Sequence, residues 1–331
     1  MDSLGQFPDN EMNNQQYPEQ TGMFITLPNE MEGFTLCSFL GGGSTGKVFK
    51  ALQTKEYAVK VIYWRTNNTH EIAKHEYAVG KLFNSCDETL HSLNYYEQDH
   101  QSYIIMEYGV PCLSYYANRE CSLRDILKTV LRMSKALEQI HAKGYSHFDV
   151  KPENIMMVRG EAKLADFSHC SQFLHEQKYN RPMGTGVYMA PEIMVGGEFT
   201  GKEDMYSLGI SMYALLMAGR LPFDFSKRES QRRERYDTID SLFIHPELLE
   251  IIQHAAAFDA CDRYDEFEEF SSAILRFINT HNDRIDEEMP LYRINPTLQH
   301  TVSTLPSFTW NGPFCDNETK DSVSILPDSL S

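Results

Sequence analysis

The hydrophobic pattern changes once along the chain, near Tyr108, and this change limits the possible folds more than any other feature of the sequence. Before Tyr108, alternating residues favour an antiparallel meander, interrupted by one helical pattern at 69–83. The runs of strand character lie at 34–40, 47–52, 56–63, 93–97 and 103–107. Beyond Tyr108, apolar residues recur at helical spacing, first from Leu123 to Ile140. The sequence therefore predicts an α+β fold: a small antiparallel β lobe with one helix, followed by a larger, mainly helical lobe.

Three further helices are expected, at 204–218, 246–258 and 264–281. The stretch without charge that comes nearest to a membrane span is 205–219, bounded by Asp204 and Arg220. Its length falls short of the roughly 18 residues that a spanning helix needs. We therefore expect a buried core helix here and no membrane partner.

The acidic balance of the chain limits its partners. Its 30 Lys and Arg residues against 47 Asp and Glu residues leave a net charge of -17. Nucleic acids and anionic membranes are bound by basic surfaces, so neither is an expected partner. Residues 1–30 are predicted to be a flexible acidic leader, and 282–331 a disordered tail. One domain is predicted between them, with a small lobe at 31–107 and a large lobe at 108–281.

Cysteine usage indicates the compartment. Seven cysteines without a C-x-x-C pair are too few for a disulfide scaffold, so reduced thiols are expected. The start of the chain, MDSLGQFPDNEMNNQQ, has neither a basic nor an apolar segment, so no signal peptide is expected. We therefore expect a cytoplasmic location, with the nucleus as the alternative.

A glycine-rich loop at 41–48, GGGSTGKV, fits two phosphate-binding patterns. In the Walker pattern, Val48 would stand where a hydroxyl must bind magnesium, and a helix rather than a strand would follow. In the pattern G-x-G-x-x-G-x-V all positions match, through Gly41, Gly43, Gly46 and Val48. The second interpretation is favoured; taken alone, the loop also fits a glycine-rich hairpin without a ligand.

Lys60 lies on the same face of the third predicted strand as Ala58. An inward lysine is costly unless anions meet it, and phosphates and a helix carboxylate would supply them. Glu76 lies sixteen residues further on, in the predicted helix. Each charge alone also fits a solvated side chain, but the spacing from the glycine loop favours a pair.

The segment 147–154, HFDVKPEN, and Asp166 twelve residues after it carry the strongest chemical signal. Two acids, a lysine and an amide between short apolar runs fit phosphoryl transfer better than packing. One carboxylate would accept a hydroxyl proton, one carboxylate and one amide would hold Mg²⁺, and the lysine would meet the transferred phosphate.

In this order the motifs resemble the eukaryotic protein kinase family over about residues 34–281. The resemblance implies a bilobal protein kinase fold and an ATP- and Mg²⁺-dependent enzyme that acts in signalling. The implied catalytic residues are Lys60, Glu76, Asp149, Lys151 and Thr185. The implied ATP-binding residues are Leu40, Gly41, Gly42, Gly43, Ser44, Thr45, Gly46, Val48, Ala58, Lys60, Met106, Glu107, Tyr108, Asn154, Met156 and Asp166. The resemblance further implies that Asp149 accepts the hydroxyl proton, that Lys151 meets the transferred phosphate and that Asn154 and Asp166 bind Mg²⁺. Similarity also places Glu192, Asp204 and Arg263 in structural roles.

Serine or threonine specificity is implied by the resemblance. Lys151, two residues after Asp149, is typical of that type, and Thr185 would bond to both. Protein substrates with Ser or Thr acceptors are therefore the expected partners. Residues 219–224 are similar to calcium/calmodulin-dependent and sucrose-nonfermenting-like kinases.

Three departures from the family pattern suggest a different function or regulation. Phe148 replaces an arginine that receives an activating phosphate, so regulation by that route is not expected. Ser168 replaces a glycine that adopts positive φ. Gly80 stands where a bulky residue stacks on Phe167, which suggests a looser helix or an activating partner there. These departures support the alternative of a pseudokinase that acts as a scaffold.

Overall fold

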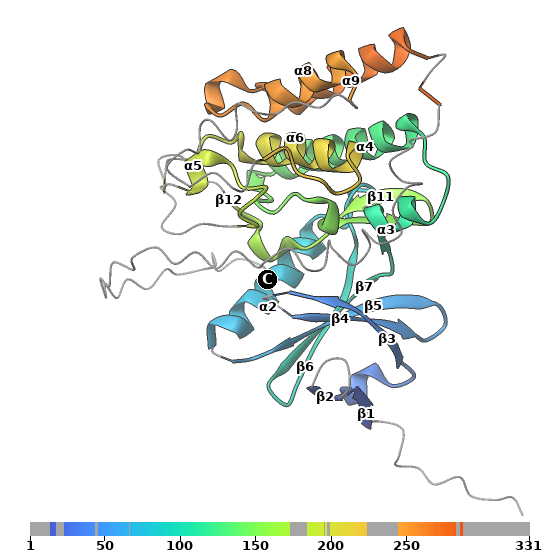
Figure 1. The fold of residues 1–331 in the computed structure, drawn as a ribbon. Coiled ribbons are helices and arrows are strands. Elements are labelled where there is room, and N and C mark those ends of the chain that lie inside the picture. Colours follow the sequence, from blue (N-terminus) through green and yellow to red (C-terminus); the bar gives the residue numbers. More distant parts are fainter. Residues whose placement is uncertain are drawn as a thin grey trace, which may run out of the picture.

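The computed structural model describes residues 14–17, 23–43, 46–65, 67–172, 184–194, 196, 199–223, 244–282 and 285–286 of the 331 in the chain. Within these ranges, a small β lobe precedes a larger helical lobe, and the helix α2 (Asn67–Leu82) lies between the sheet and the large lobe (Figure 1). The predicted α+β architecture is confirmed.

One five-stranded antiparallel sheet forms the small lobe, in the order β3-β4-β5-β7-β6. Its strands are β3 (Thr35–Gly42), β4 (Lys47–Leu52), β5 (Glu56–Tyr63), β6 (Ser92–Gln98) and β7 (Gln101–Glu107). Alternation along β5 sends Val59 and Val61 to one face, where they pack with Phe49 in the lobe's main core. Lys60 and Ile62 therefore share the opposite face, which α2 covers.

The large lobe is built on two central helices, α4 (Leu123–Ala142) and α6 (Glu203–Leu216). Ser122 and Asp125 form a capping box that fixes the start of α4. Helices α8 (Pro246–Ala255) and α9 (Phe267–Thr280) pack on α6 and α4 at the end of the lobe farthest from the sheet (Figure 1). The shorter helices are α3 (Cys112–Ala117) and α5 (Pro191–Met194).

Short strands hold the loops between these helices. Antiparallel strands β8 (Val110–Pro111), β10 (Ile155–Val158) and β11 (Glu161–Leu164) form one small sheet. A second pairs β9 (Tyr145–Ser146) with β12 (Ser171–Gln172). Two 3-10 turns, Pro152–Asn154 and Phe167–His169, lie between these strands. The turns place the two acidic motifs of the sequence next to each other.

Every residue of α6 is buried, as expected of a core helix. Its low polarity thus reflects burial on all sides within the large lobe. Among the residues that the structure describes, no helix has both the length and the apolar composition for crossing a bilayer.

Part of the predicted leader forms secondary structure, which its composition did not indicate. β1 (Asn14–Tyr17) and β2 (Met23–Thr26) pair antiparallel, and the short 3-10 turn Asn29–Met31 follows. Leu27 and Met31 are buried in the main core of the small lobe, which gives this segment an apolar anchor. The rest of the leader, and all of the predicted tail except 282 and 285–286, lie outside the described residues.

Candidate active site

Lys60 joins the two lobes through a pair of carboxylates. Its Nζ lies 2.6 Å from Glu76 Oε1 on α2 and 3.2 Å from Asp166 Oδ1 in the large lobe. The side chains of Lys60 and Glu76 are almost fully buried, so water screens this pair very little. The structure therefore brings together the lysine, the helix carboxylate and the acidic motif that the sequence analysis paired.

The opposite charges of Lys60 and Asp166 stabilise each other, whereas burial, together with the Asp166 charge, raises the pKa of Glu76 to about 7 despite Lys60. Burial alone disfavours the Lys60 ammonium, but the carboxylates of Asp166 and Glu76 outweigh it and hold the pKa of Lys60 above its usual value. Burial likewise disfavours the Asp166 carboxylate, but Lys60 and the backbone N–H of Ser168 hold its pKa well below the usual range. At neutral pH both groups are ionised, as phosphate and metal binding require.

Asp149 is surrounded by hydrogen-bond donors. Its Oδ1 accepts from the backbone N–H and the hydroxyl of Thr185, at 2.8 Å and 2.7 Å. Its Oδ2 accepts from Lys151 Nζ at 2.7 Å and from Asn154 Nδ2 at 2.9 Å. Lys151 also donates to the Thr185 hydroxyl. Burial disfavours the charged carboxylate, but Lys151 and Thr185 hold the pKa of Asp149 below its usual value.

The loop that carries Asp149 is held by hydrogen bonds to Asp204, the second residue of α6. The backbone N–H groups of His147 and Phe148 donate to its two oxygens, at 2.7 Å and 2.8 Å. The side chain of His141, in the last turn of α4, supplies a third bond at 2.8 Å. The bracing by Asp204 follows the expectation, whereas no sequence motif pointed to His141.

The glycine loop lies close against β5. A Cβ atom added to Gly46 would meet the carbonyl oxygen of Val61 at 2.8 Å, so only glycine fits there. The N–H of Gly43 donates to the carbonyl of Gly46 at 2.9 Å and closes the loop. Ser44 and Thr45, both predicted to contact the nucleotide, lie outside the described residues.

The remaining predicted nucleotide residues lie on facing strands. Ala58 is paired with Met106 across β5 and β7 and is buried. Met106 and Met156 pack against the same small apolar cluster, formed by Leu90, Val158 and Ala165. Gly41 is paired with Val48 at the turn end of the β3–β4 hairpin, and Gly42 lies beside it. Leu40 is 41% exposed, so its side chain is available to a ligand.

Glu107 is the last residue of β7, and Tyr108 follows it where the chain passes from the small lobe to the large one. The Glu107 carboxylate accepts from Lys163 Nζ at 2.9 Å and from the backbone N–H of His91 at 3.2 Å. This side chain thus bonds to protein groups, and the contact of the Glu107 backbone with a nucleotide stays a prediction. The partners Lys163 and His91 lie far away in sequence, and no pattern in the sequence indicated them.

The end of the 184–194 segment is held by Arg263. Arg263 Nη1 and Nη2 bond to the two carboxylate oxygens of Glu192 at 2.7 Å and 2.8 Å. The guanidinium group is fully buried and also donates to three backbone carbonyls, those of Ala257, Phe258 and Lys202. This pair was expected from the family resemblance.

Phe148, the first departure, is buried and has φ of 63°. Its ring makes an edge contact with Phe199, with centroids 5.4 Å apart. Apolar packing thus occupies a position where an arginine would carry charge. Ser168, the second departure, lies in a 3-10 turn and does not have positive φ, so it causes no backbone strain.

Gly80, the third departure, leaves no space beside Phe167. An added Cβ would meet Ser92 Oγ at 2.4 Å and Phe167 Cδ2 at 3.4 Å. The stacking partner of Phe167 is Phe83 instead, with ring centroids 5.7 Å apart and an interplanar angle of 18°. Phe83 is fully buried. The loose packing expected from the glycine is therefore not present.

We expect Gly80→Leu to lower the melting temperature. Overpacking against Ser92 and Phe167 costs about 1–3 kcal/mol, and the better helix propensity of leucine returns roughly 0.8 kcal/mol of this. Ala78→Leu, on the exposed side of α2, is the matched control and should change stability little. Thermal unfolding measures both variants. A more stable Gly80→Leu protein would show that a gap exists beside Phe167.

Comparison with known proteins gives one family and several relatives. A profile described as protein kinase domain matches residues 34–285. Probable serine/threonine-protein kinase gdt4 of Dictyostelium discoideum is 29% identical over 224 residues, which are 63% of this chain and 13% of that protein. Serine/threonine-protein kinase pakC of the same organism is 32% identical over 183 residues, 52% of this chain and 38% of that protein. Serine/threonine-protein kinase dst1 of Dictyostelium discoideum is 31% identical over 219 residues, which are 64% of this chain and 29% of that protein. The chain thus spans well under two thirds of each relative.

Proposed function

The chain belongs to the protein kinase family, because the family profile matches most of its length, and on this premise we propose that it transfers the γ-phosphate of Mg-ATP to serine or threonine hydroxyls of proteins. The observation that carries the proposal is the bonding of Asp149 to Lys151, Asn154 and Thr185. An acid, a cation and an amide held at one point are the groups that phosphoryl transfer requires.

The residues present fit a magnesium ion. The amide nitrogen of Asn154 is bonded to Asp149, so its oxygen faces away from that carboxylate. Lys60 and Ser168 both bond to Oδ1 of Asp166, which leaves Oδ2 for a cation. Carboxylate and amide oxygens are ligands that Mg²⁺ accepts. When bound, Mg²⁺ would neutralise charge on the phosphates of ATP.

The roles of the other residues follow from their positions. Lys60, held by Glu76, has a third ammonium proton to donate to a phosphate oxygen. Asp149 orients the substrate hydroxyl and accepts its proton. Lys151, between Asp149 and Thr185, provides positive charge near the transferred group. The link through Thr185 is the feature that supports Ser/Thr specificity, and the three named relatives are likewise described as serine/threonine kinases.

The alternative is a pseudokinase that acts as a scaffold. The departures at Phe148, Ser168 and Gly80 motivate it, but each of the three is accommodated without disturbing the bonds of Asp149 or Lys60. We therefore favour an active enzyme. A scaffold would bind nucleotide or a partner without turnover, so the same assay distinguishes the two functions.

Regulation is also part of the proposal. Because Phe148 is buried against Phe199, activity should not depend on a phosphate bound at this position. An activating partner at α2 would contact its outer face, where Glu71, Lys74 and Ala78 are exposed, and not the closed position at Gly80. A cytoplasmic or nuclear location and the resemblance of 219–224 to one kinase group stay predictions.

We expect Lys60→Met to lower the turnover of phosphate transfer by about 10²–10³-fold, the loss typical of one removed electrostatic donor. The assay uses purified protein, Mg-ATP and a degenerate peptide library with Ser, Thr or Tyr as the acceptor. Lys74→Met, an exposed lysine on α2, is the control and should retain activity. The wild type should label Ser or Thr peptides only. If the wild type labels peptides no more strongly than Lys60→Met does, the protein is not an active kinase and the scaffold function is favoured.

A further inference from the structure

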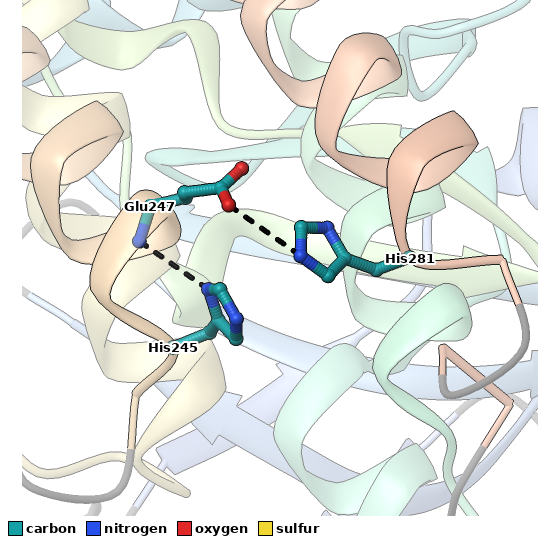
Figure 2. A group of neighbouring side chains, drawn as sticks. All are labelled: His245, Glu247 and His281. Atoms are coloured by element: carbon teal, nitrogen blue, oxygen red, sulfur yellow. Dashed lines mark hydrogen bonds and ion pairs between the residues drawn. The ribbon is translucent and has the colours of Figure 1, made fainter.

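Two histidines and one glutamate meet where α8 begins and α9 ends (Figure 2). His245 is the N-cap of α8, Glu247 lies in its first turn, and His281 is the C-cap of α9. One nitrogen or oxygen atom of each side chain lies within 4.8 Å of the others. The helix pair is at the end of the large lobe farthest from the sheet, so this group has no part in the chemistry of Asp149 (Figure 1).

The ring of His281 is fixed by a backbone bond. Its Nδ1 lies 3.1 Å from the carbonyl oxygen of Phe277. A carbonyl can only accept, so Nδ1 carries the proton and Nε2 has a lone pair in the neutral ring. That Nε2 lies 3.4 Å from Oε1 of Glu247. A lone pair and a carboxylate oxygen that face each other at this distance are two donors that one metal ion can bind together.

The ring of His245 adds a third donor. The backbone N–H of Glu247 donates to His245 Nδ1 at 3.3 Å, so this nitrogen also has a lone pair (Figure 2). The bond is longer than the usual 2.7–3.2 Å range, so exchanging it for a stronger ligand costs little. Nε2 of His245 would then keep its proton. The three donors thus combine two imidazole nitrogens and one carboxylate oxygen.

Phe277 holds both rings in place. Its ring centroid is 5.1 Å from that of His245 and 4.5 Å from that of His281, and the two imidazole centroids are 4.6 Å apart. Side chains that are already ordered lose less entropy when they bind a ligand. The bond from His281 to the Phe277 carbonyl is also of the kind that orients histidine ligands in metal sites.

We propose that His245, Glu247 and His281 form a binding site for a divalent transition-metal ion, zinc above all. Two histidines and one glutamate are a known ligand set for zinc, with water in the fourth position. Zinc-to-ligand distances of about 2.0–2.2 Å place such donors about 3.3 Å apart, so the donors, now within 4.8 Å of one another, must move closer, chiefly through the half-exposed Glu247 side chain. Mg²⁺ and Ca²⁺ prefer oxygen ligands, so a site with two imidazole nitrogens should bind them weakly. The bound ion joins the start of α8 to the end of α9.

The test is a zinc titration of the full chain after treatment with a chelator and desalting. A competing fluorescent chelator measures affinity, and thermal unfolding measures the stabilisation that binding must produce. Removing an outer hydrogen-bond partner of a metal ligand already weakens metal binding by about 10–100-fold. Because His281→Gln and His245→Asn each remove a ligand itself, we expect each to weaken zinc binding by more than this. Asparagine is a good N-cap, so His245→Asn removes the imidazole while preserving the start of α8.

Two controls separate this site from others on the chain. His254→Gln removes another exposed histidine of α8 and should bind zinc like the wild type. Cobalt in place of zinc reports the ligand type, because thiolates of the exposed Cys37 or Cys261 would give charge-transfer bands that imidazoles do not. Equal affinity in His281→Gln and the wild type, thiolate bands, or no binding at all would overturn the proposal.

Discussion

Asp149→Asn is expected to lower the turnover number of phosphate transfer by about 10²–10⁴-fold, the contribution of a positioned general base. All four donors around Asp149, two from Thr185 and one each from Lys151 and Asn154, point at carboxylate oxygens. The amide group of asparagine must turn its own N–H₂ toward two of them. The variant therefore loses the proton acceptor and also loses two of these four hydrogen bonds, either those from Thr185 or those from Lys151 and Asn154.

A matched control separates lost chemistry from damage to the fold. Glu153→Gln makes the same carboxylate-to-amide change in the same loop. Burial raises the pKa of Glu153, so an amide there is better tolerated. Steady-state kinetics with ATP and the preferred peptide, together with melting temperatures, compare the two variants. Wild-type turnover in Asp149→Asn would exclude Asp149 as the residue that handles the substrate hydroxyl.

The central residues of the site could be predicted because short motifs determine their surroundings. Asp149, Lys151 and Asn154 lie within six consecutive residues, so one turn of chain fixes their mutual placement. The position of Lys60 could be predicted from alternation along the strand. Alternation places its side chain on the face of β5 that α2 covers, independently of the rest of the fold. The pairing with Glu76 needed only the predicted helix after that strand.

The residues that were missed act across long sequence distances. Phe83 stacks on Phe167 in place of a residue at Gly80, which depends on how α2 packs against the large lobe. His141 reaches Asp204 from a different helix, and Lys163 reaches Glu107 from a different lobe. Periodicity reports which face of an element is buried, but it does not report the element that the face meets.

Composition was misleading at the N-terminus. The Asn, Gln and Pro content of residues 1–30 predicts a flexible leader, yet β1 and β2 pair, and Leu27 is buried in the core. An average over thirty residues does not reveal a single apolar side chain such as Leu27, whose burial favours packing of this segment on the core.

Arg263→Met is expected to destabilise the large lobe by about 3–5 kcal/mol, the cost of leaving one partner of a buried ion pair without the other. Methionine preserves much of the side-chain volume, so the loss reports charge and hydrogen bonding rather than a cavity. The carboxylate of Glu192 and three backbone carbonyls would lose their donor together. At about 2–4 °C per kcal/mol for a domain of this size, the melting temperature should fall by roughly 6–20 °C.

A double variant shows whether the ion pair itself is the cause. Because burying an unpaired charge is costlier than burying none, Arg263→Met with Glu192→Leu should be more stable than Arg263→Met alone. Arg276→Met, at an exposed position on α9, should stay within about 0.5 kcal/mol of the wild type. Thermal unfolding of the four proteins measures these differences. The contrary result is a double variant that is the least stable of the four proteins. Glu192→Leu would then remove only packing and relieve no unpaired charge. In that case the bonds from Arg263 to the three backbone carbonyls, and not its ion pair with Glu192, would account for the stabilisation.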